Sequence, residues 1–343
     1  MRCSVEAEPL RLNLSRYTVH ADDVCVTIVG ANVGDVGRVP ATLRGANLTE
    51  NAANITALTN VDPRFLNYAL LEANAQGQLK QFAGGAAQPK LALYKMEQVA
   101  VFCPPLRLQR RIADILSAYD DLIENNTKRI KILEEMARSL YREWFVNFRF
   151  PGHEKVKMVS SPTGKVPGGW SIVSLGDLAD IQWGDTSTTK ASYVAYGFTA
   201  YSASGPDGFL DHADIIHDGV VLSAIGAQCG KSWYARGSWS CIKNTIRFWG
   251  TDQRRASTPY QFHVTRDPSY WPKRGAAQPF ISLGDAKKGQ VVIPNAELMG
   301  QFTAVVRTCL AQQGTLTAAN SNLRSQRDLL LPRLISGEIS VVP

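Results

Sequence analysis

The longest uninterrupted helical pattern in the chain runs from Leu106 to Phe148 and contains neither glycine nor proline. Pro104 and Pro105 stand just upstream, where a helix can begin but cannot continue. Seam residues recur within it at alternating intervals of three and four, the spacing of a coiled coil: Ile112, Ile115, Tyr119, Leu122, Asn126, Ile130, Leu133, Ala137, Leu140 and Trp144. At 1.5 Å per residue this helix would be roughly 60 Å long. It cannot bury such a seam alone and therefore requires a partner helix.

A second helical pattern, from Leu298 to Leu334, repeats this rhythm. Asn320 lies on its seam, and Gly314 is its weakest position because glycine lowers helix stability. Its apolar seam residues are Phe302, Val305, Val306, Leu310, Leu316, Leu323, Leu330 and Leu334. We predict that the two helices pair within the chain as an antiparallel coiled coil. The alternative is two separate surface helices.

Length and composition bound the class of protein. A chain of 343 residues can form two domains that each bury a core. Its six cysteines lack metal-ligand or disulfide spacing, which indicates reduced thiols, and we expect a cytoplasmic protein. No segment has the length of a membrane span or the character of a signal peptide, so no membrane partner is expected. The net charge of +7 is mild and leaves nucleic-acid binding and a solvated basic face equally open.

Two globular regions of the chain share the same motifs in the same order. The pentapeptide Gly-Ala-Ala-Gln-Pro at 85–89 recurs at 275–279, and VGANVG at 29–34 matches IGAQCG at 225–230. Each copy proceeds through strand, glycine turn, helix, pentapeptide, strand and long helix, which predicts a duplicated α/β module. The expected organisation is a first domain at 1–103, a first spacer helix at 104–148, a linker at 149–166, a second domain at 167–294, and a second spacer helix with a tail at 295–343.

The first module is the shorter one. Nearly fifty residues separate Trp170 from Asp218 ahead of the second glycine turn, whereas 21 residues precede Asp22 ahead of the first. The first module has no counterpart of GGWSIVSLGDL at 168–178. We therefore expect the first domain to be N-terminally incomplete and less protected than the second, because a sheet that lacks an opening strand has an exposed edge.

Four stretches carry a family resemblance: PPLRLQRRIADILSAYDDLIENN at 104–126, LYREWFVNFRFPGHE at 140–154, PGGWSIVSLGDLADIQWG at 167–184 and RDLLLPRLISGEI at 327–339. Together they resemble the specificity (S) subunits of type I restriction-modification enzymes, and the resemblance covers the whole chain. It implies an α/β fold with two tandemly repeated target-recognition domains separated by two long antiparallel coiled-coil helices. Such a chain would read the two halves of a bipartite target on double-stranded DNA.

The same resemblance implies partners that perform the chemistry. Two modification (M) subunits would bind S-adenosylmethionine and methylate adenine, and restriction (R) subunits would use ATP and Mg²⁺ to translocate and cut. This chain is expected to bind none of these cofactors. One alternative is the recognition subunit of a related system in which cleavage and methylation share one polypeptide. Another is a coiled-coil scaffold that does not bind DNA.

Catalytic motifs are absent from the sequence. It holds no GxxxxGK[ST] phosphate loop and no Asn-Pro-Pro-Tyr type loop for methylating adenine. The turn Gly30–Gly34 lacks the third glycine of a dinucleotide loop, so a tight turn between strands explains it better. Five scattered histidines form no triad and no metal cluster. We expect no catalytic residue and no metal site.

DNA contacts require Lys, Arg and small polar side chains for phosphates, and side chains that reach base edges. The candidates in the second domain are Thr186, Ser187, Thr188, Thr189, Lys190, Tyr193, Lys231, Arg236, Lys243, Arg254, Arg255, Lys273 and Arg274. Those in the first domain are Arg38, Arg44, Asn47 and Lys80. A solvated surface role is the alternative for each. Residues that recur in both copies, the pairs Asn51/Asn244 and Gln88/Gln278, favour a structural role.

Overall fold

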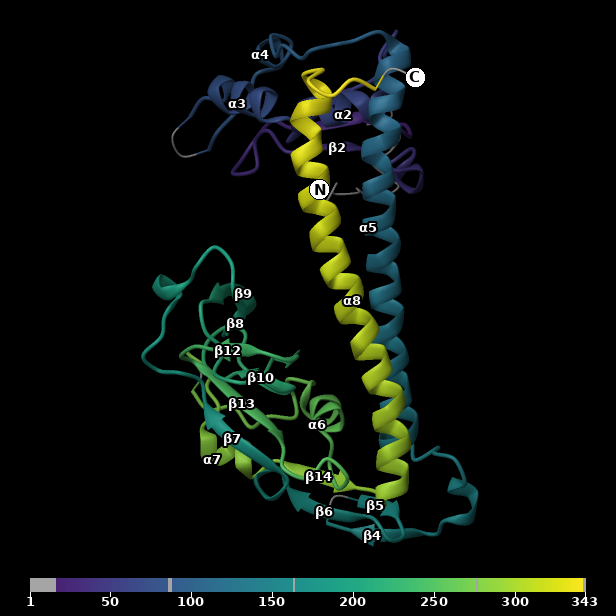
Figure 1. The fold of residues 1–343 in the computed structure, drawn as a ribbon, viewed down its shortest axis with the longest axis vertical. Helices are drawn as coiled ribbons and strands as arrows, with labels where there is room; N and C mark the ends of the chain where they lie inside the picture. Colours follow the sequence, from purple (N-terminus) through teal and green to yellow (C-terminus); the bar gives the residue numbers. More distant parts are fainter. Residues whose placement is uncertain (1–16, 86–87, 163, 276, 342–343) are drawn as a thin grey trace. The chain divides into compact units, whose positions relative to one another are not determined.

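The structure is a computed structural model that describes residues 17–85, 88–162, 164–275 and 277–341. The chain divides into two compact units. Unit 1 consists of residues 1–128 and 316–343, and unit 2 consists of residues 129–315. Each unit therefore contains one α/β module and a part of both long helices, α5 (Leu106–Tyr141) and α8 (Ala296–Ile335) (Figure 1).

The module of unit 1 is built on a small antiparallel sheet. Strand β1 (Val24–Thr27) lies between β2 (Val36–Arg38) and β3 (Ala52–Ile55). Helices α2 (Pro63–Leu71) and α3 (Ala73–Phe82) follow, then the short α4 (Leu93–Met96). Asp62 caps α2 by accepting from the backbone N–H groups of Arg64 and Phe65, as a helix N-terminus requires. Apolar residues of the sheet and of both helices close the core: Val24, Val26, Leu66, Leu70, Ala75 and Leu79.

The module of unit 2 is larger. Its main sheet has the order β11 (Ser232–Ala235), β10 (Gly219–Ser223), β13 (Thr245–Gly250), β7 (Ala179–Trp183), and all its pairs are antiparallel. A second sheet has the order β12 (Trp239–Cys241), β8 (Phe198–Ser202), β9 (Gly205–Leu210). Strand β6 (Ser171–Ser174) pairs with β14 (Gln290–Ile293), and α6 (Thr258–Thr265) and α7 (Leu283–Lys287) complete the module. Segment 149–166, expected as a linker, contains most of a hairpin of β4 (Met158–Ser161) and β5 (Gly164–Pro167).

The duplication inferred from the sequence is present in the backbone. The N–H of Gly30 donates to the carbonyl of Pro89 at 2.9 Å, and the N–H of Gly226 donates to that of Pro279 at 2.9 Å. The carbonyls of Asn51 and Asn244 likewise accept from Ile28 and Ala224 at 2.8 and 3.0 Å. Each glycine turn is thus tied in the same way to the repeated pentapeptide and to the following strand. The predicted fold class, two tandem α/β modules with long antiparallel helices, is confirmed.

The antiparallel pairing is visible in each unit. In unit 1 the first turns of α5 pack against the last turns of α8, so that Ile112 and Leu116 share a core with Leu334. Further along the same pair, the Nδ2 of Asn126 donates to the Oδ1 of Asn320 at 2.9 Å. In unit 2 the last turns of α5 and one turn of π-helix at Arg142–Val146 pack against the first turns of α8. A polar pair inside an otherwise apolar seam fixes the register of a coiled coil at some expense of stability.

The seam of α5 differs from the predicted one at two positions. Ile115 and Leu122 are 37% and 51% exposed, whereas the neighbouring Leu116 is buried in a core with Leu334 of α8 and Ile123 is half-buried. Both sites carry two consecutive apolar residues, so the three-four spacing did not decide between them. Of the other predicted seam residues, Ile112, Phe302, Val306 and Leu316 are buried, and Tyr119, Ile130, Leu133, Leu140, Leu323 and Leu330 are half-buried.

Candidate nucleic-acid interface

Several candidate residues of unit 2 meet at one end of its main sheet. Strands β7 and β10 end there, and β11 and β13 begin there. The loops 184–190, 224–231 and 242–244 extend from this edge, and we call them the loop end of unit 2. The N–H of Gly184 donates to the carbonyl of Thr245 at 2.9 Å, which joins the first loop to the third. A Cβ on Gly184 would overlap that strand, so only glycine permits the approach.

Three lysines of the candidate set belong to this end. Lys231 closes the glycine turn, where its carbonyl accepts from Ser223 at 2.8 Å, and Lys243 lies on the turn between β12 and β13. Lys273 lies against Gly230, since a Cβ there would meet the Cε of Lys273 at 2.8 Å. Gly230 has φ +92°, so the turn both needs glycine and leaves room for the lysine. All three side chains are exposed, which gives the loop end a basic surface.

The polar loop at 184–190 is folded on an aspartate. The Asp185 carboxylate accepts from the hydroxyls of Ser187 and Thr188 and from the N–H of Ser187. These bonds, led by that from Thr188, lower the pKa of Asp185 to about 2. The Thr189 hydroxyl accepts from the N–H of Ala191. Thr186 and Ser187 are exposed, and Thr188 and Thr189 are half-buried. The loop is therefore rigid and bears a negative charge beside the lysines.

Two further candidates near this loop form a cluster around Asp207. The Nζ of Lys190 donates to Asp207 at 2.5 Å and the Tyr193 hydroxyl donates to it at 2.8 Å. Burial, followed by the hydrogen bond to Asp207, raises the pKa of the Tyr193 hydroxyl. A lysine paired in this way has less charge to offer to a phosphate than Lys231, Lys243 or Lys273.

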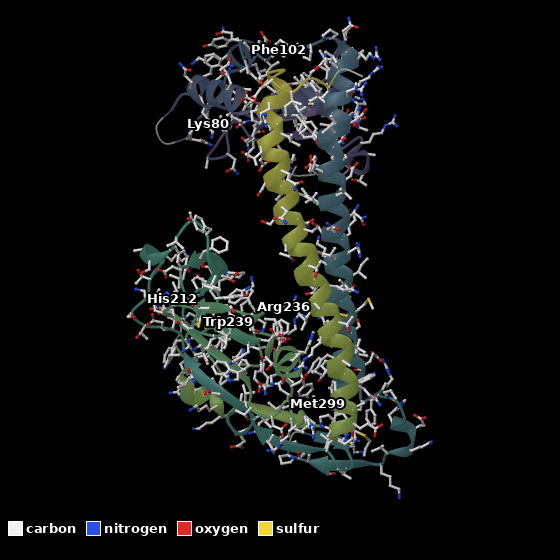
Figure 2. All side chains as sticks on the ribbon, viewed as in Figure 1. Lys80, Phe102, His212, Arg236, Trp239 and Met299 are labelled. Atoms are coloured by element: carbon white, nitrogen blue, oxygen red, sulfur yellow. The ribbon has the colours of Figure 1, made fainter. Side chains whose placement is uncertain are left out.

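The remaining candidates of unit 2 lie elsewhere. Arg236 follows β11 at the opposite end of the main sheet, and its guanidinium donates to main-chain carbonyls of α8, beside which Figure 2 labels it. The expected role of Arg236 as a DNA contact stays a prediction, and its Nη1 is already engaged by α8. Arg254 and Arg255 follow β13 at that same opposite end and are exposed. Arg274 is exposed but pairs with Asp285 at 2.6 Å.

In unit 1 the corresponding loop end is formed by loops 28–35 and 48–51, where β1 ends and β2 and β3 begin. Lys80 of α3 is exposed. It lies near this loop end, because the Cβ of the adjoining Leu79 would be 3.6 Å from a Cβ placed on Gly34. Lys90, which the sequence analysis missed, bridges to Val29 of this loop and is exposed. Its position directly after the pentapeptide repeat was the available signal.

The other three candidates of unit 1 are placed differently. Arg38, at the far end of β2, donates to Asp22 at 2.7 Å, and Arg44 is exposed on the turn before β3. Asn47 is 3% exposed and bridges to Thr18. Because its side chain is buried, the expectation that Asn47 contacts DNA is corrected.

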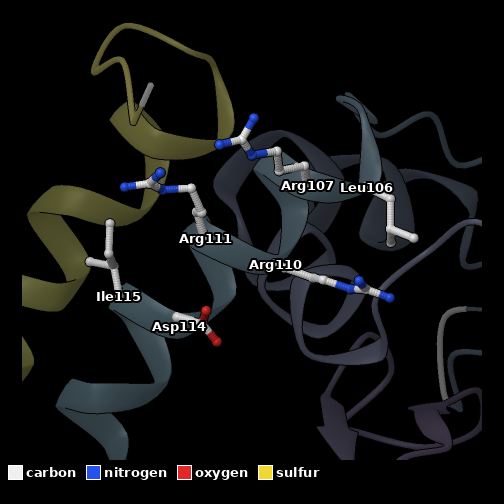
Figure 3. Close-up of a pocket in the computed structure, with 6 residues that line it drawn as sticks. All are labelled: Leu106, Arg107, Arg110, Arg111, Asp114 and Ile115. Atoms are coloured by element: carbon white, nitrogen blue, oxygen red, sulfur yellow. The ribbon is translucent and has the colours of Figure 1, made fainter. Parts of the chain in front are cut away.

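A basic pocket of about 600 Å³ lies along the first turns of α5 in unit 1. Arg107, Arg110 and Arg111 line it with Asp114, which pairs with Arg64 at 2.7 Å. Figure 3 shows Arg107 and Arg111 projecting to one side of the helix and Arg110 to the other. These arginines are not among the candidates predicted from the sequence. Their signal was the basic excess of residues 104–166, twelve basic against eight acidic side chains.

In the part of the chain that the structure describes, no three His, Cys, Asp or Glu side chains gather as a metal site. Nor does any helix among these residues combine the length and apolar character needed to cross a membrane. The exposed surface at the loop ends therefore offers charge and hydrogen-bonding groups, which suit the recognition of a polyanion.

Comparisons with known proteins agree with this geometry. Residues 13–135 match the family model of the Type I restriction modification DNA specificity domain. The chain is 23% identical to the Type I restriction enzyme MjaIX specificity subunit of Methanocaldococcus jannaschii, over 92% of this chain and 78% of that protein. It is 22% identical to the HindI specificity subunit of Haemophilus influenzae, over 81% and 77%.

The fold has a solved counterpart. A crystal structure of a type I restriction-modification S subunit from M. genitalium matches with a TM-score of 0.59 at 16% identity, covering 94% of this chain and 84% of that one. This likeness shows that the two chains share a fold. The chain is thus similar to the specificity subunits of type I restriction-modification enzymes, and the resemblance noted in the sequence is confirmed.

Proposed function

We propose that this chain is the sequence-specific DNA-binding specificity subunit of a type I restriction-modification complex and reads a bipartite target. The observation that carries the proposal is the repeated loop end. Both modules turn from β1 or β10 into the same glycine turn, and both place exposed lysines beside it. Two copies of one reading surface suit a target made of two half-sites, and lysines on the rim suit the phosphates that flank the bases.

The proposed assembly follows from the family. Two modification subunits would dock on the chain and supply S-adenosylmethionine and the methyltransferase chemistry. Restriction subunits would supply ATP- and Mg²⁺-dependent translocation and cleavage. The absence of phosphate-loop and adenine-methylation motifs from the sequence supports a chain that contributes recognition and no catalytic step. The proposed site of action is the cytoplasm.

The test is reconstitution with the modification subunits of the same host. The full chain with these subunits should form a complex of one S and two M, and should methylate adenine in one bipartite sequence. The chain alone should show no methyltransferase, nuclease or ATPase activity. Binding to the mapped target should exceed binding to a duplex with scrambled half-sites by at least about 10³-fold at physiological salt. Catalytic turnover by the lone chain, or equal affinity for both duplexes, would contradict the proposal.

The same reconstitution addresses the two alternatives. A recognition subunit of a fused system would bind the mapped target but require a single partner polypeptide for both methylation and cleavage. A scaffold that does not bind DNA would show no salt-dependent shift with any duplex, since phosphate contacts make affinity fall with salt. Either result would replace the proposed assembly.

A further inference from the structure

In unit 2, the Arg236 side chain contacts the backbone of α8 at a glycine. Arg236 lies on the turn between β11 and β12, and its Nη1 donates to the carbonyls of Leu310 and Ala311 at 2.7 and 3.3 Å. The facing residue of α8 is Gly314, and a Cβ there would overlap the Nη1 of Arg236. The one glycine that weakens the middle of α8 is therefore the one that admits the arginine to the helix backbone.

The turn that presents Arg236 is held on both sides. The Asp218 carboxylate accepts from the Tyr234 hydroxyl at 2.8 Å and from the N–H of Gly237 at 3.0 Å. The residue before Arg236, Ala235, is fully buried, and Gly237 takes a left-handed φ of +63°. Arg236 thus extends from a fixed backbone, so its guanidinium reaches α8 with little loss of side-chain and loop freedom.

This contact lies at the far end of a series of attachments of the module to α8, which includes the hydrogen bond from Arg307 to Gln253 at 3.1 Å and the buried Val306 and Leu310. The first lies near the start of the helix, where Thr303 donates to Ser257 at 2.7 Å and Phe302 packs edge-on against Tyr260. Phe302 and Gly314 are separated by about 18 Å along a helix axis. Contacts spread over this separation restrain the tilt of the module on the helix, and Arg236 supplies the hydrogen bonds at the far end of the series.

We propose that Arg236 and Gly314 are positioning residues that fix the tilt of the second recognition module on α8, and so hold its loop end at a set angle to the spacer helix. The inference rests on the proposed function for its consequence in DNA reading. It follows that loss of the contact should relax the discrimination between the target with its native gap and targets with one base pair more or less. The affinity for a duplex that carries either half-site alone should change little.

Two arms of the experiment need no DNA. In the first, the full chain carries spin labels at Phe209 on β9 and at Gln312 on α8, with Cys3 and Cys103 replaced by serine. The parent should give one narrow distance distribution, and Arg236→Met and Gly314→Ala should each broaden or shift it. Arg254→Met, a change at another exposed arginine of unit 2, is the matched control and should leave it unchanged. The same distribution in all four proteins would overturn the proposal.

The second arm is a double-mutant cycle on the melting temperature. Arg236→Met should lower Tm by ~3 °C, because a charged hydrogen bond is lost in a unit of this size. Gly314→Ala should be more favourable by a similar ~3 °C in the Arg236→Met background than in the parent, because the clash then has no partner. Gly300→Ala, where a Cβ meets only open space on the same helix, should have equal effects in both backgrounds. Additive effects of Arg236→Met and Gly314→Ala on Tm would contradict the proposed contact between the two residues.

The third arm uses the reconstituted complex with its modification subunits. Arg236→Met should reduce the preference for the native gap over a gap longer by one base pair by ~10-fold or more, while Lys288→Met, at an exposed position outside the candidate set, keeps it. An unchanged gap preference would overturn the consequence for DNA reading. If the parent complex itself fails to discriminate targets, the proposed function fails. The spin-label distances and the double-mutant cycle would still decide whether Arg236 and Gly314 fix the tilt of the module.

Discussion

The two modules attach to the long helices through matching residues of different chemistry. Counted from its capping residue, the sixth residue of α2 in unit 1 is Tyr68, and the sixth of α6 in unit 2 is His263. The Tyr68 hydroxyl donates to Asp120 of α5 at 2.5 Å, and Asp120 pairs with Arg327 of α8. His263 instead lies against the rings of Tyr141 and Phe302, at 5.8 and 5.9 Å between centroids.

The surroundings of these residues continue the contrast. In unit 1 the seam carries the Asn126–Asn320 pair, and the Thr127 hydroxyl accepts from the Nδ2 of Asn320 at 3.2 Å. In unit 2 the seam is lined by rings, with Phe145 meeting Phe302 at 5.0 Å. Duplication thus preserved the backbone ties of the glycine turn but not the attachment to the helices. Directional polar bonds set register in unit 1, and ring packing supplies most of the stability in unit 2.

The largest effect is expected in the ring cluster of unit 2. Phe302 is fully buried, so Phe302→Ala should lower the free energy of unfolding by about 3–5 kcal/mol. Val305→Ala on the same helix, where the side chain is 47% exposed, should change it by less than about 0.5 kcal/mol. Denaturant unfolding of the full chain measures both. Similar costs for the two variants would mean that the cluster does not hold unit 2 to α8.

Adjacent residues of α5 test the corrected seam of unit 1. Leu116 is fully buried against the end of α8, so Leu116→Ala should cost about 2–5 kcal/mol. Ile115→Ala, one residue earlier, should cost less than about 1 kcal/mol because that side chain stays in contact with water. Thermal and denaturant unfolding of the two variants should separate them clearly. A reversed order would restore the seam first predicted from the sequence.

The pH dependence of stability should differ between the units because of His263. Burial, and to a lesser degree the charge of Arg266, lowers the pKa of His263 to about 3. The unfolded chain, with an ordinary histidine pKa near 6.5, then binds a proton that the folded state does not. The contribution of neutral His263 to the free energy of unfolding is therefore complete above about pH 6.5. It is lost as the pH falls below that value, by roughly 1.4 kcal/mol per pH unit.

Unfolding of unit 2 between pH 7 and 5 measures this effect. His263→Phe keeps a ring between Tyr141 and Phe302 and should flatten the pH dependence over that range. His153→Phe, at a half-exposed histidine of the same unit, is the matched control and should leave the slope in place. A slope that survives His263→Phe would assign the titration to another group.

The smallest effect is expected for the polar network of unit 1. Arg327→Met removes the ion pair with Asp120 and leaves the Tyr68 hydrogen bond. Because both charged groups are partly exposed, the cost should be about 1 kcal/mol and should shrink at high salt. Arg324→Met, an exposed position on the same helix, should cost less than this. A cost that is independent of salt would indicate lost packing of the arginine stem instead.

Much of this fold was predictable because it follows from spacing and repetition. The seams of Ile112 and Phe302 and the matched pentapeptides depend on local periodicity, which the chain states directly. The choice between Ile115 and Leu116 depends on which residue faces α8, and adjacent apolar residues satisfy the same spacing. That choice is settled by packing between segments about two hundred residues apart, which no local pattern records.

The candidate site was predictable in its location more than in its members. Lys231 and Lys243 adjoin motifs that were recognised, and the strands bring these motifs to one edge. Arg236 could not be separated from them, since a sequence does not show that an arginine on a turn donates to a helix carbonyl 74 residues later. Asn47 was named for its residue type, but the bridge with Thr18 buries it.

The central claim is that the loop ends bind DNA, and the salt dependence of affinity tests it most directly. In the reconstituted complex, Lys231→Gln, Lys243→Gln and Lys273→Gln combined should reduce the slope of log K against log salt by up to about 2.7, at about 0.9 for each lost phosphate contact. Lys287→Gln with Lys288→Gln, which removes exposed charge at and just after the end of α7, should leave the slope unchanged. Equal slopes for the triple variant and the parent, with unchanged target affinity, would contradict the claim.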